Sequence, residues 1–339
     1  MKLFSIVSPC AVAKRLLCLL AAAFGCLSCE DSIFTDQSDC LRGLSLRFVY
    51  DYNMEYANAF PKKVDCLSLY VFDEAGNYVT TLTETSDVLA DEAYRMNVEL
   101  DAGDYTLVAY GGLACAESSF TIPDFATRAY SHIDDLRVEL KHTNFLSNEA
   151  LHGLYYGTLN VTIEEDDFVE GTVYMIKDTN NIKIALQQIN GKTIAASQFK
   201  FEITDDNSYM DRYNRVVPKG MVTYTPWTTG QEIVGSWEDN DTPVSVAWAE
   251  LSTARLVVEN NPRLTITNRE TGEVVFSIPL KEYLLLLKSD LYADMSAQEF
   301  LDRESEWSMI FFLDDGFRWI NVEIIINGWT VRLNHIDGL

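Results

Sequence analysis

The sequence has few basic residues. It carries 26 lysines and arginines against 51 aspartates and glutamates, a formal net charge of −25 at pH 7 over 339 residues. Such a surface repels the phosphates of nucleic acids and the head groups of anionic lipids, so no nucleic-acid partner is expected. Hydrophobic residues still make up 47% of the chain, which favours a folded core over an acidic disordered tail.

The chain also lacks the compact motifs of catalysis and cofactor binding. It contains no His-Glu-x-x-His, no Gly-x-Ser-x-Gly, no complete phosphate-binding loop of the form Gly-x-x-x-x-Gly-Lys-Ser/Thr and no Gly-x-Gly-x-x-Gly. We therefore predict no catalytic residue, no enzyme activity and no cofactor. A glycosidase pair among the many carboxylates stays open, because such a pair is defined by a distance in space.

Candidate metal ligands are few and poorly spaced. The four histidines are His132, His142, His152 and His335, and no two of them stand four residues apart. The acidic residues 164–167 lack the Asp-x-Asp-x-Asp-Gly spacing of a calcium loop, and residues 205–207 fit a turn. No metal site is predicted.

No apolar run near the N-terminus is long enough to cross a membrane. Lys14 and Arg15 precede residues 16–27, which are almost wholly apolar. At ~1.5 Å per residue this run covers ~18 Å, short of the ~30 Å hydrocarbon core. A charged flank, a short apolar core and a polar break predict a secretory signal over residues 1–28.

A cysteine follows this signal directly. The junction Leu27-Ser28-Cys29 resembles the processing box of bacterial lipoproteins, in which the peptidase cuts before the cysteine and lipid is attached to its sulfur. We therefore predict lipid attachment at Cys29, with residues 29–40 as a lipidated tether. Cys26 is the alternative lipid site, and an ordinary signal peptide with a freely secreted product is the other alternative.

Three further cysteines remain after processing: Cys40, Cys66 and Cys115. An exported protein with an odd number of thiols is expected to hold one disulfide. Cys66 lies early in one expected strand and Cys115 just beyond another, so antiparallel pairing would bring their Cα atoms within the ~7 Å that a disulfide needs. We predict Cys66–Cys115, with Cys40–Cys115 as the alternative. No Cys-x-x-Cys pair remains, so a zinc knuckle is not expected.

Most of the chain alternates apolar and polar residues with the period of a β-strand. In the first half the expected strands are residues 44–52, 64–73, 78–83, 94–100, 105–110 and 136–140. In the second half they are residues 171–176, 181–188, 199–204, 221–225, 244–248, 255–259, 264–268, 273–278, 307–314, 319–326 and 329–333. This pattern predicts an all-β protein built of antiparallel β-sandwiches.

Helical patterns are confined to the second half. Residues 280–288 look helical and buried, and Ser296 with Glu299 forms a capping box that opens a second helix. Asn327-Gly328 predicts a hairpin turn between the last two strands. Removing residues 1–28 leaves 311 residues, which suits two domains, placed at 41–157 and 158–339.

Long framework stretches resemble one known family. They are LSLRFVYDYNMEYANAFPKKVDCLSLYVFD from Leu44, DAGDYTLVAYGGLAC from Asp101, KDTNNIKIALQQ from Lys177, NPRLTITNRETGE from Asn261 and QEFLDRESEWSMIFFLDDG from Gln298. In this order they are similar to the FimB-type fimbrial anchor subunits of Bacteroides-group bacteria, over essentially the whole mature chain.

The resemblance implies two tandem transthyretin-like β-sandwich domains, with the short helices inserted in the second. It also implies a lipoprotein of the outer membrane that anchors a fimbrium, limits its length in some systems, and has other fimbrial subunits as partners. Related subunits join by donating a β-strand. An open edge is therefore expected at the terminal strands, 44–52 or the hairpin 319–333.

The rival interpretation is a surface lipoprotein that binds glycan or acts as an adhesin. Tryptophans exposed along a groove would favour it. Trp307, Trp319 and Trp329 lie in apolar strands, so they are expected to pack in the core.

Overall fold

The computed structural model describes residues 43–123, 131–165, 168–236, 243–286, 288, 292–326 and 329–333. Strands dominate these residues and pair into sandwich-like sheets, so the all-β class is confirmed. The predicted signal, the tether, Cys26, Cys29 and Cys40 lie outside the described residues, as does the Asn327-Gly328 turn. Among the described helices, none has the length and apolarity that a membrane crossing requires.

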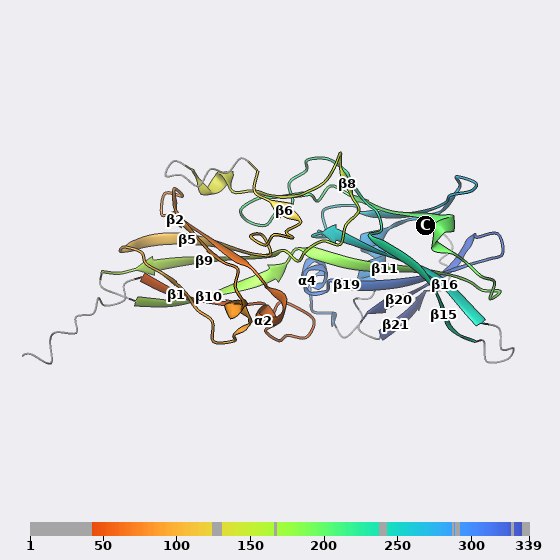
Figure 1. Ribbon diagram of the computed structural model, residues 1–339, viewed down its shortest axis with the longest axis horizontal. Coiled ribbons are helices and arrows are strands. Elements are labelled where there is room, and N and C mark those ends of the chain that lie inside the picture. Colours follow the sequence, from red (N-terminus) through yellow and green to blue (C-terminus); the bar gives the residue numbers. More distant parts are fainter. Residues whose placement is uncertain are drawn as a thin grey trace, which may run out of the picture.

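Seven strands form the first sheet, at the left of Figure 1. In spatial order they are β3 (Tyr78–Glu84), β2 (Leu67–Asp73), β5 (Gly103–Gly111), β9 (Tyr155–Ile163), β10 (Phe168–Lys177), β1 (Gly43–Val49) and β4 (Met96–Val98). β10 pairs with β1 over seven residues but with β9 only at its last three. The sheet therefore folds over at β10 and encloses a core between its two parts.

The first core buries one face of β2. Leu67, Leu69 and Val71 are fully buried there against Leu44 and Leu46 of β1. The other face of β2 is also covered, because Phe72 belongs to a second core cluster. Burial on both faces explains why this strand is apolar almost throughout.

The second half is a sandwich of two sheets. The six-stranded sheet has the order β15 (Thr228–Ser236), β16 (Pro243–Ala254), β11 (Thr179–Gln188), β19 (Glu306–Leu313), β20 (Trp319–Ile326) and β21 (Trp329–Leu333). The five-stranded sheet has the order β18 (Val274–Pro279), β17 (Arg263–Asn268), β12 (Phe199–Asp205), β14 (Val222–Tyr224) and β8 (Leu146–Ser147).

Short elements connect the two halves. β6 (Phe120–Thr121), β7 (Val138–Leu140) and β13 (Tyr209–Met210) form a small sheet that draws strands from both halves, and β8 adds to β14 of the second half. One apolar cluster accordingly runs from Phe72 to Leu313. Within the described residues the helices are α2 (Phe60–Lys63), α3 (Leu280–Leu285), α4 (Ala297–Arg303) and the 3-10 turns η1 (Asp87–Ala90), η2 (Ile133–Asp135) and η3 (Ala196–Gln198).

Several sequence expectations need correction. The sheets are mixed, because β1 pairs with β10, β19 with β11 and β14 with β8 in parallel. Residues 255–259 form no strand, and α3 ends at Leu285, earlier than expected. Ser296 caps α4 by accepting from the backbone N–H of Glu299, but the Glu299 carboxylate pairs with Arg303. Helical turns also occur in the first half.

β10 and β11 run end to end across the middle of the molecule, with only Asp178 between them (Figure 1). The Asp178 N–H donates to the Leu154 carbonyl at 2.7 Å, and its buried carboxylate accepts from Asn214 Nδ2 at 2.7 Å. Since β9 and β10 complete the first sheet, we propose that the two halves divide at Asp178, later than residue 157.

A largely buried arginine holds this junction. Arg255, just after β16, donates from Nε and Nη2 to the Asp302 carboxylate of α4, both at 2.8 Å. Its Nε lies 3.8 Å from Asp178 Oδ1. Because Asp302 already engages the guanidinium, burial dominates at Asp178 and raises the pKa of its carboxyl to about 7.

A second arginine reaches back into the first half. Arg303 of α4 stacks its guanidinium 3.9 Å from the ring centroid of Tyr52. It also donates to the carbonyls of Asp51 and Asn53 at 3.4 and 3.5 Å. α4 therefore binds the loop that follows β1, and the two halves contact one another through charged as well as apolar groups.

The raised pKa of Asp178 makes stability depend on pH. The folded protein holds this proton to about pH 7, whereas the unfolded chain releases it near pH 3.8. The contribution of Asp178 to the free energy of unfolding should therefore fall by about 4 kcal/mol as pH rises from 4 to 7, at 1.36 kcal/mol per pH unit. In Asp178→Asn this fall should disappear, as measured by denaturant unfolding at several pH values.

The exposed Asp87 supplies the control for this experiment. Asp87→Asn should leave the pH profile unchanged. Parallel profiles for wild type and Asp178→Asn would contradict a raised pKa at the junction.

Candidate functional site

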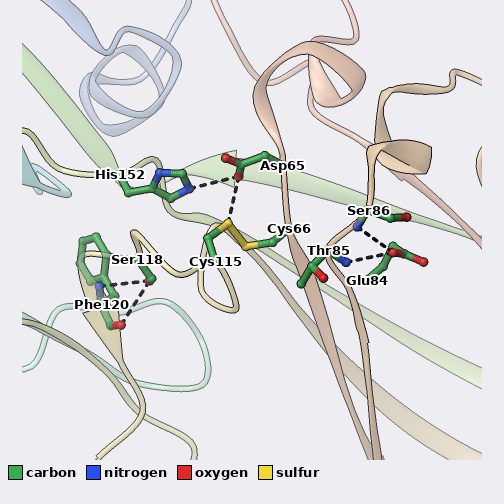
Figure 2. The surroundings of a disulfide bond; sticks show 9 residues. All are labelled: Asp65, Cys66, Glu84, Thr85, Ser86, Cys115, Ser118, Phe120 and His152. Carbon is green, nitrogen blue, oxygen red and sulfur yellow. Dashed lines mark hydrogen bonds and ion pairs between the residues drawn. A yellow bond between two sulfur atoms is a disulfide. The ribbon is translucent and has the colours of Figure 1, made fainter.

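Two of the predicted site residues are described, and they meet at one end of the first sheet. Cys66 directly precedes β2, and Cys115 follows β5, which pairs antiparallel with β2 so that Leu67 stands opposite Gly111. The two cysteines are joined by a disulfide with Cα atoms 5.5 Å apart (Figure 2). The backbone N–H of Gly112 donates to the Cys66 carbonyl at 2.9 Å and closes the same corner.

The described chain begins at β1. Gly43 has φ +119°, and a Cβ there would lie 2.2 Å from the carbonyl oxygen of Val98 in β4. Only glycine fits this left-handed, crowded position without strain. The start of β1 is thereby fixed against β4 on one side and β10 on the other, so load arriving from the N-terminal side reaches a firmly paired strand.

The expectation of an open edge at the first strand is wrong. β1 pairs with β10 along its whole length and with β4 at Leu44, Ser45 and Leu46. Sequence alone could not show this, since β10 lies more than a hundred residues later in the chain. Among the described residues β1 is an inner strand.

The other expected edge is present. β20 and β21 coincide with the predicted strands 319–326 and 329–333, and in the described part of the chain β21 pairs with β20 alone. Its five residue pairs follow one register without interruption. An edge of this kind presents unpaired backbone N–H and C=O groups to another strand.

The remaining edges of the described sheets are less regular. β15 shifts register against β16 between Ile233 and Ser236, and β3 shifts against β2. β18 has a shift and ends at Pro279. β4 and β8 contain three and two residues. Bulges, proline and short length all blunt an edge, so β21 is the best candidate for strand addition.

The buried carboxylates are engaged within the protein. Asp302 binds Arg255, Asp205 accepts from Asn260 Nδ2 at 3.0 Å, and Glu304 accepts from the backbone N–H groups of residues 305 and 306. Burial raises the pKa of Asp205 to about 6. These contacts tie chain segments together and resemble structural ties more than a catalytic pair.

The tryptophans in the C-terminal strands are core residues where they are described. Trp307 is 2% exposed and donates from Nε1 to Asn180 at 3.0 Å, and Trp319 packs on the second core cluster. The side chain of Trp329 lies outside the described residues. Trp227, which no sequence motif marks, is 42% exposed.

Comparison with known proteins identifies one family model. The model, described as fimbrillin-A associated anchor proteins Mfa1 and Mfa2, matches residues 37–335. The minor fimbrium anchoring subunit Mfa2 of Porphyromonas gingivalis is 21% identical over 327 residues, 94% of each chain. The solved structure of the fimbrial anchor protein Mfa2 from that species covers 86% of this chain and 99% of its own at 16% identity, with a TM-score of 0.64.

Two solved structures from Bacteroides thetaiotaomicron are more similar. One, described as a candidate adhesin, is 52% identical, with a TM-score of 0.82, over 88% of this chain and 100% of its own. The other, described as a candidate polysaccharide-binding protein, is 30% identical, with a TM-score of 0.75, over 86% and 98%.

Proposed function

This chain belongs to the family of fimbrillin-A associated anchor proteins Mfa1 and Mfa2, and we propose that it is an outer-membrane lipoprotein that holds a fimbrium on the cell surface. Family membership over residues 37–335 is the observation that carries the role in anchoring. The family is one of structural proteins of the fimbrium. We further propose that this chain carries a lipid, joins a fimbrial subunit by strand addition and controls the length of the fibre.

An anchor must hold the membrane at one end and the fibre at the other. The proposed membrane end is Cys29, with Cys26 as the alternative; Cys29 directly follows a signal whose apolar run is too short to span the bilayer. Each buried acyl CH₂ contributes ~0.8 kcal/mol, and stable anchoring needs more than one chain. A lipidated cysteine carrying several acyl chains meets this requirement.

The geometry of β1 suits a load from the membrane side. The tether would pull β1 toward Gly43, while the fibre would pull β10 toward β11 and the second half. Because β1 and β10 are parallel over seven residue pairs, these opposite pulls run along both strands. All the ladder hydrogen bonds between them then share the load, and no single bond has to open first.

The proposed fibre end is the outer edge of β21. A strand from another fimbrial subunit would extend the six-stranded sheet, since strand addition supplies backbone hydrogen bonds along the full edge. A subunit fixed in the membrane in this way would stop growth at the base of the fibre, which is how an anchor could set fibre length.

The alternative function is glycan binding or adhesion at the cell surface. A relative of 30% identity is described as a candidate polysaccharide-binding protein, and Trp227 is an exposed aromatic on this chain. Trp307 and Trp319, however, contribute to the core, which leaves fewer aromatic side chains for a sugar platform.

The membrane end is tested by replacing Cys29. In Cys29→Ala cells, lipid attachment should be lost, and fibres should move from the cell fraction to the medium together with the anchor. The measurement is fimbrial antigen in washed cells and in medium, with Cys26→Ala as the matched control. Cell-bound fibres of normal number and length in cells lacking this protein would defeat the anchor function and favour glycan binding.

The fibre end is tested by a photo-crosslinking residue placed on one edge at a time. At position 330, in β21, it should form a covalent adduct with a fimbrial subunit on intact cells. At Val79, exposed on the irregular edge strand β3, it should form none. Adducts from Val79 alone would move the joint to the first half, and adducts from neither position would contradict joining through these edges.

A further inference from the structure

Three chain segments bring metal-binding side chains together beside the disulfide. Asp65 and Cys66 precede β2, Cys115 follows β5, and His152 precedes β9 (Figure 2). The Asp65 Oδ1, Cys115 Sγ and His152 Nε2 atoms all lie within 4.8 Å of one another. The fourth candidate, Cys66 Sγ, is bonded to Cys115 Sγ at 2.01 Å.

A glycine makes this meeting possible. Gly112 has φ +81°, and a Cβ there would lie 1.7 Å from the carbonyl oxygen of Gly153. The loop that carries Cys115 can therefore press against the loop that carries His152 only with glycine at this position. The backbone N–H of His152 also donates to Ser119 Oγ at 2.8 Å, which holds the second loop in place.

The contacts of Asp65 are not explained by the disulfide. Its Oδ1 atom lies 3.1 Å from His152 Nε2 and 3.0 Å from Cys115 Sγ. A sulfur in a disulfide has no hydrogen to donate, so the second contact gains no hydrogen bond. One carboxylate oxygen therefore lies beside a cysteine sulfur and an imidazole nitrogen, and once reduction frees the sulfur as a thiolate this is an arrangement that a shared cation would favour.

We propose that, when the disulfide is reduced, Asp65, Cys66, Cys115 and His152 bind one zinc ion. Zinc takes cysteine sulfur at about 2.3 Å and histidine nitrogen or carboxylate oxygen at about 2.0–2.2 Å in a tetrahedron, which places neighbouring ligand atoms about 3.3–3.8 Å apart. Oδ1 and Nε2 already approach this spacing. Reduction would let the two sulfurs separate toward it, within the Cα separation of 5.5 Å.

A small thiol compound is the reductant that opens the Cys66–Cys115 disulfide. Two thiol molecules give up two electrons and two protons to the Cys66–Cys115 bond, which leaves two protein thiols and one external disulfide. Zinc binding then releases both thiol protons, since thiolate is the ligand. His152 binds as the neutral imidazole through Nε2. Two thiolates and one carboxylate around Zn²⁺ leave a net charge of −1.

The position suits exchange with the surroundings. The side chain of Asp65 is 61% exposed and that of His152 is 22% exposed, so a metal ion can approach without unfolding. Cys66 is 1% exposed and anchors the site from inside. Sequence spacing alone predicts no metal site here, because the four proposed ligands come from positions 65, 66, 115 and 152. They form no Cys-x-x-Cys pair and come together only in the folded chain.

The test uses the purified mature protein with Cys40→Ser, which removes a third thiol. After reduction with a phosphine, zinc alone is added, excess is removed, and bound metal is measured by mass spectrometry. We expect one zinc per reduced chain and none per oxidised chain. Cobalt(II) in place of zinc should show thiolate-to-metal charge-transfer absorption in the reduced protein.

Substitutions of the two non-cysteine ligands test whether zinc binds at this site. His152→Ala and Asp65→Asn should each weaken zinc binding at least tenfold. The matched controls are His132→Ala and Asp134→Asn, since His132 Nδ1 lies 3.4 Å from the Asp134 carboxylate in a pair with no cysteine. These control variants should bind zinc as the parent does.

Three results would overturn the proposal: no zinc in the reduced protein, equal binding in the oxidised protein, or unchanged affinity in His152→Ala and Asp65→Asn. Should reduction unfold the chain, zinc must restore the folded circular dichroism spectrum, because binding free energy then contributes to folding. A chain that stays unfolded with zinc would also overturn it. The proposal does not depend on the anchor function.

Discussion

The contact between Arg255 and the buried Asp302 is the interaction on which the rest of this structure depends. It closes the point where β10 passes into β11 and places a cation 3.8 Å from the buried Asp178. The pair is bidentate, and removal of one partner from a buried pair typically costs about 3–5 kcal/mol, because the other charge is left uncompensated. Three distant segments, around residues 178, 255 and 302, are therefore held in one arrangement.

From this junction the architecture extends in both directions. β10 lies in the first sheet between β9 and β1, and β11 lies in the second between β16 and β19. A continuous apolar cluster and the stacking of Arg303 on the Tyr52 ring add contacts between the halves beside β10 and β11. These contacts join the halves on both sides of Asp178, so we expect them to bear load as one unit, which is the property that an anchor between a membrane and a fibre requires.

Sequence patterns predicted the parts of this fold that depend on neighbours in the chain. The last two strands coincide with β20 and β21 because both runs are rich in apolar β-formers, residues 329–333 alternate apolar and polar side chains, and an Asn-Gly pair separates the two runs. β9 is not among the strands that the sequence pattern predicts, and the predicted domain boundary after residue 157 falls within it. In the folded chain β9 pairs with β5 on one side and β10 on the other, and these partners are distant from it or unpredictable from local sequence.

The rest could not be read from the sequence, for a physical reason. The parallel pairing of β1 with β10, the Asp178–Arg255–Asp302 contacts and the approach of His152 to Asp65 all join segments far apart in the chain. Nothing in local periodicity specifies such partners. Framework stretches spread along the chain, rather than a compact motif, distinguish this family, so the role in anchoring a fimbrium rests on family membership.

Single-molecule pulling from the N-terminal side of β1 tests the load path most directly. With the second handle on β11, the pull shears the β1–β10 ladder. With the second handle at Phe168, at the same end as Gly43, it peels the strands apart one bond at a time. The account predicts a clearly higher rupture force for the β11 handle. Equal forces in the two geometries, or separation of the halves at Asp178 before β1 detaches, would contradict it.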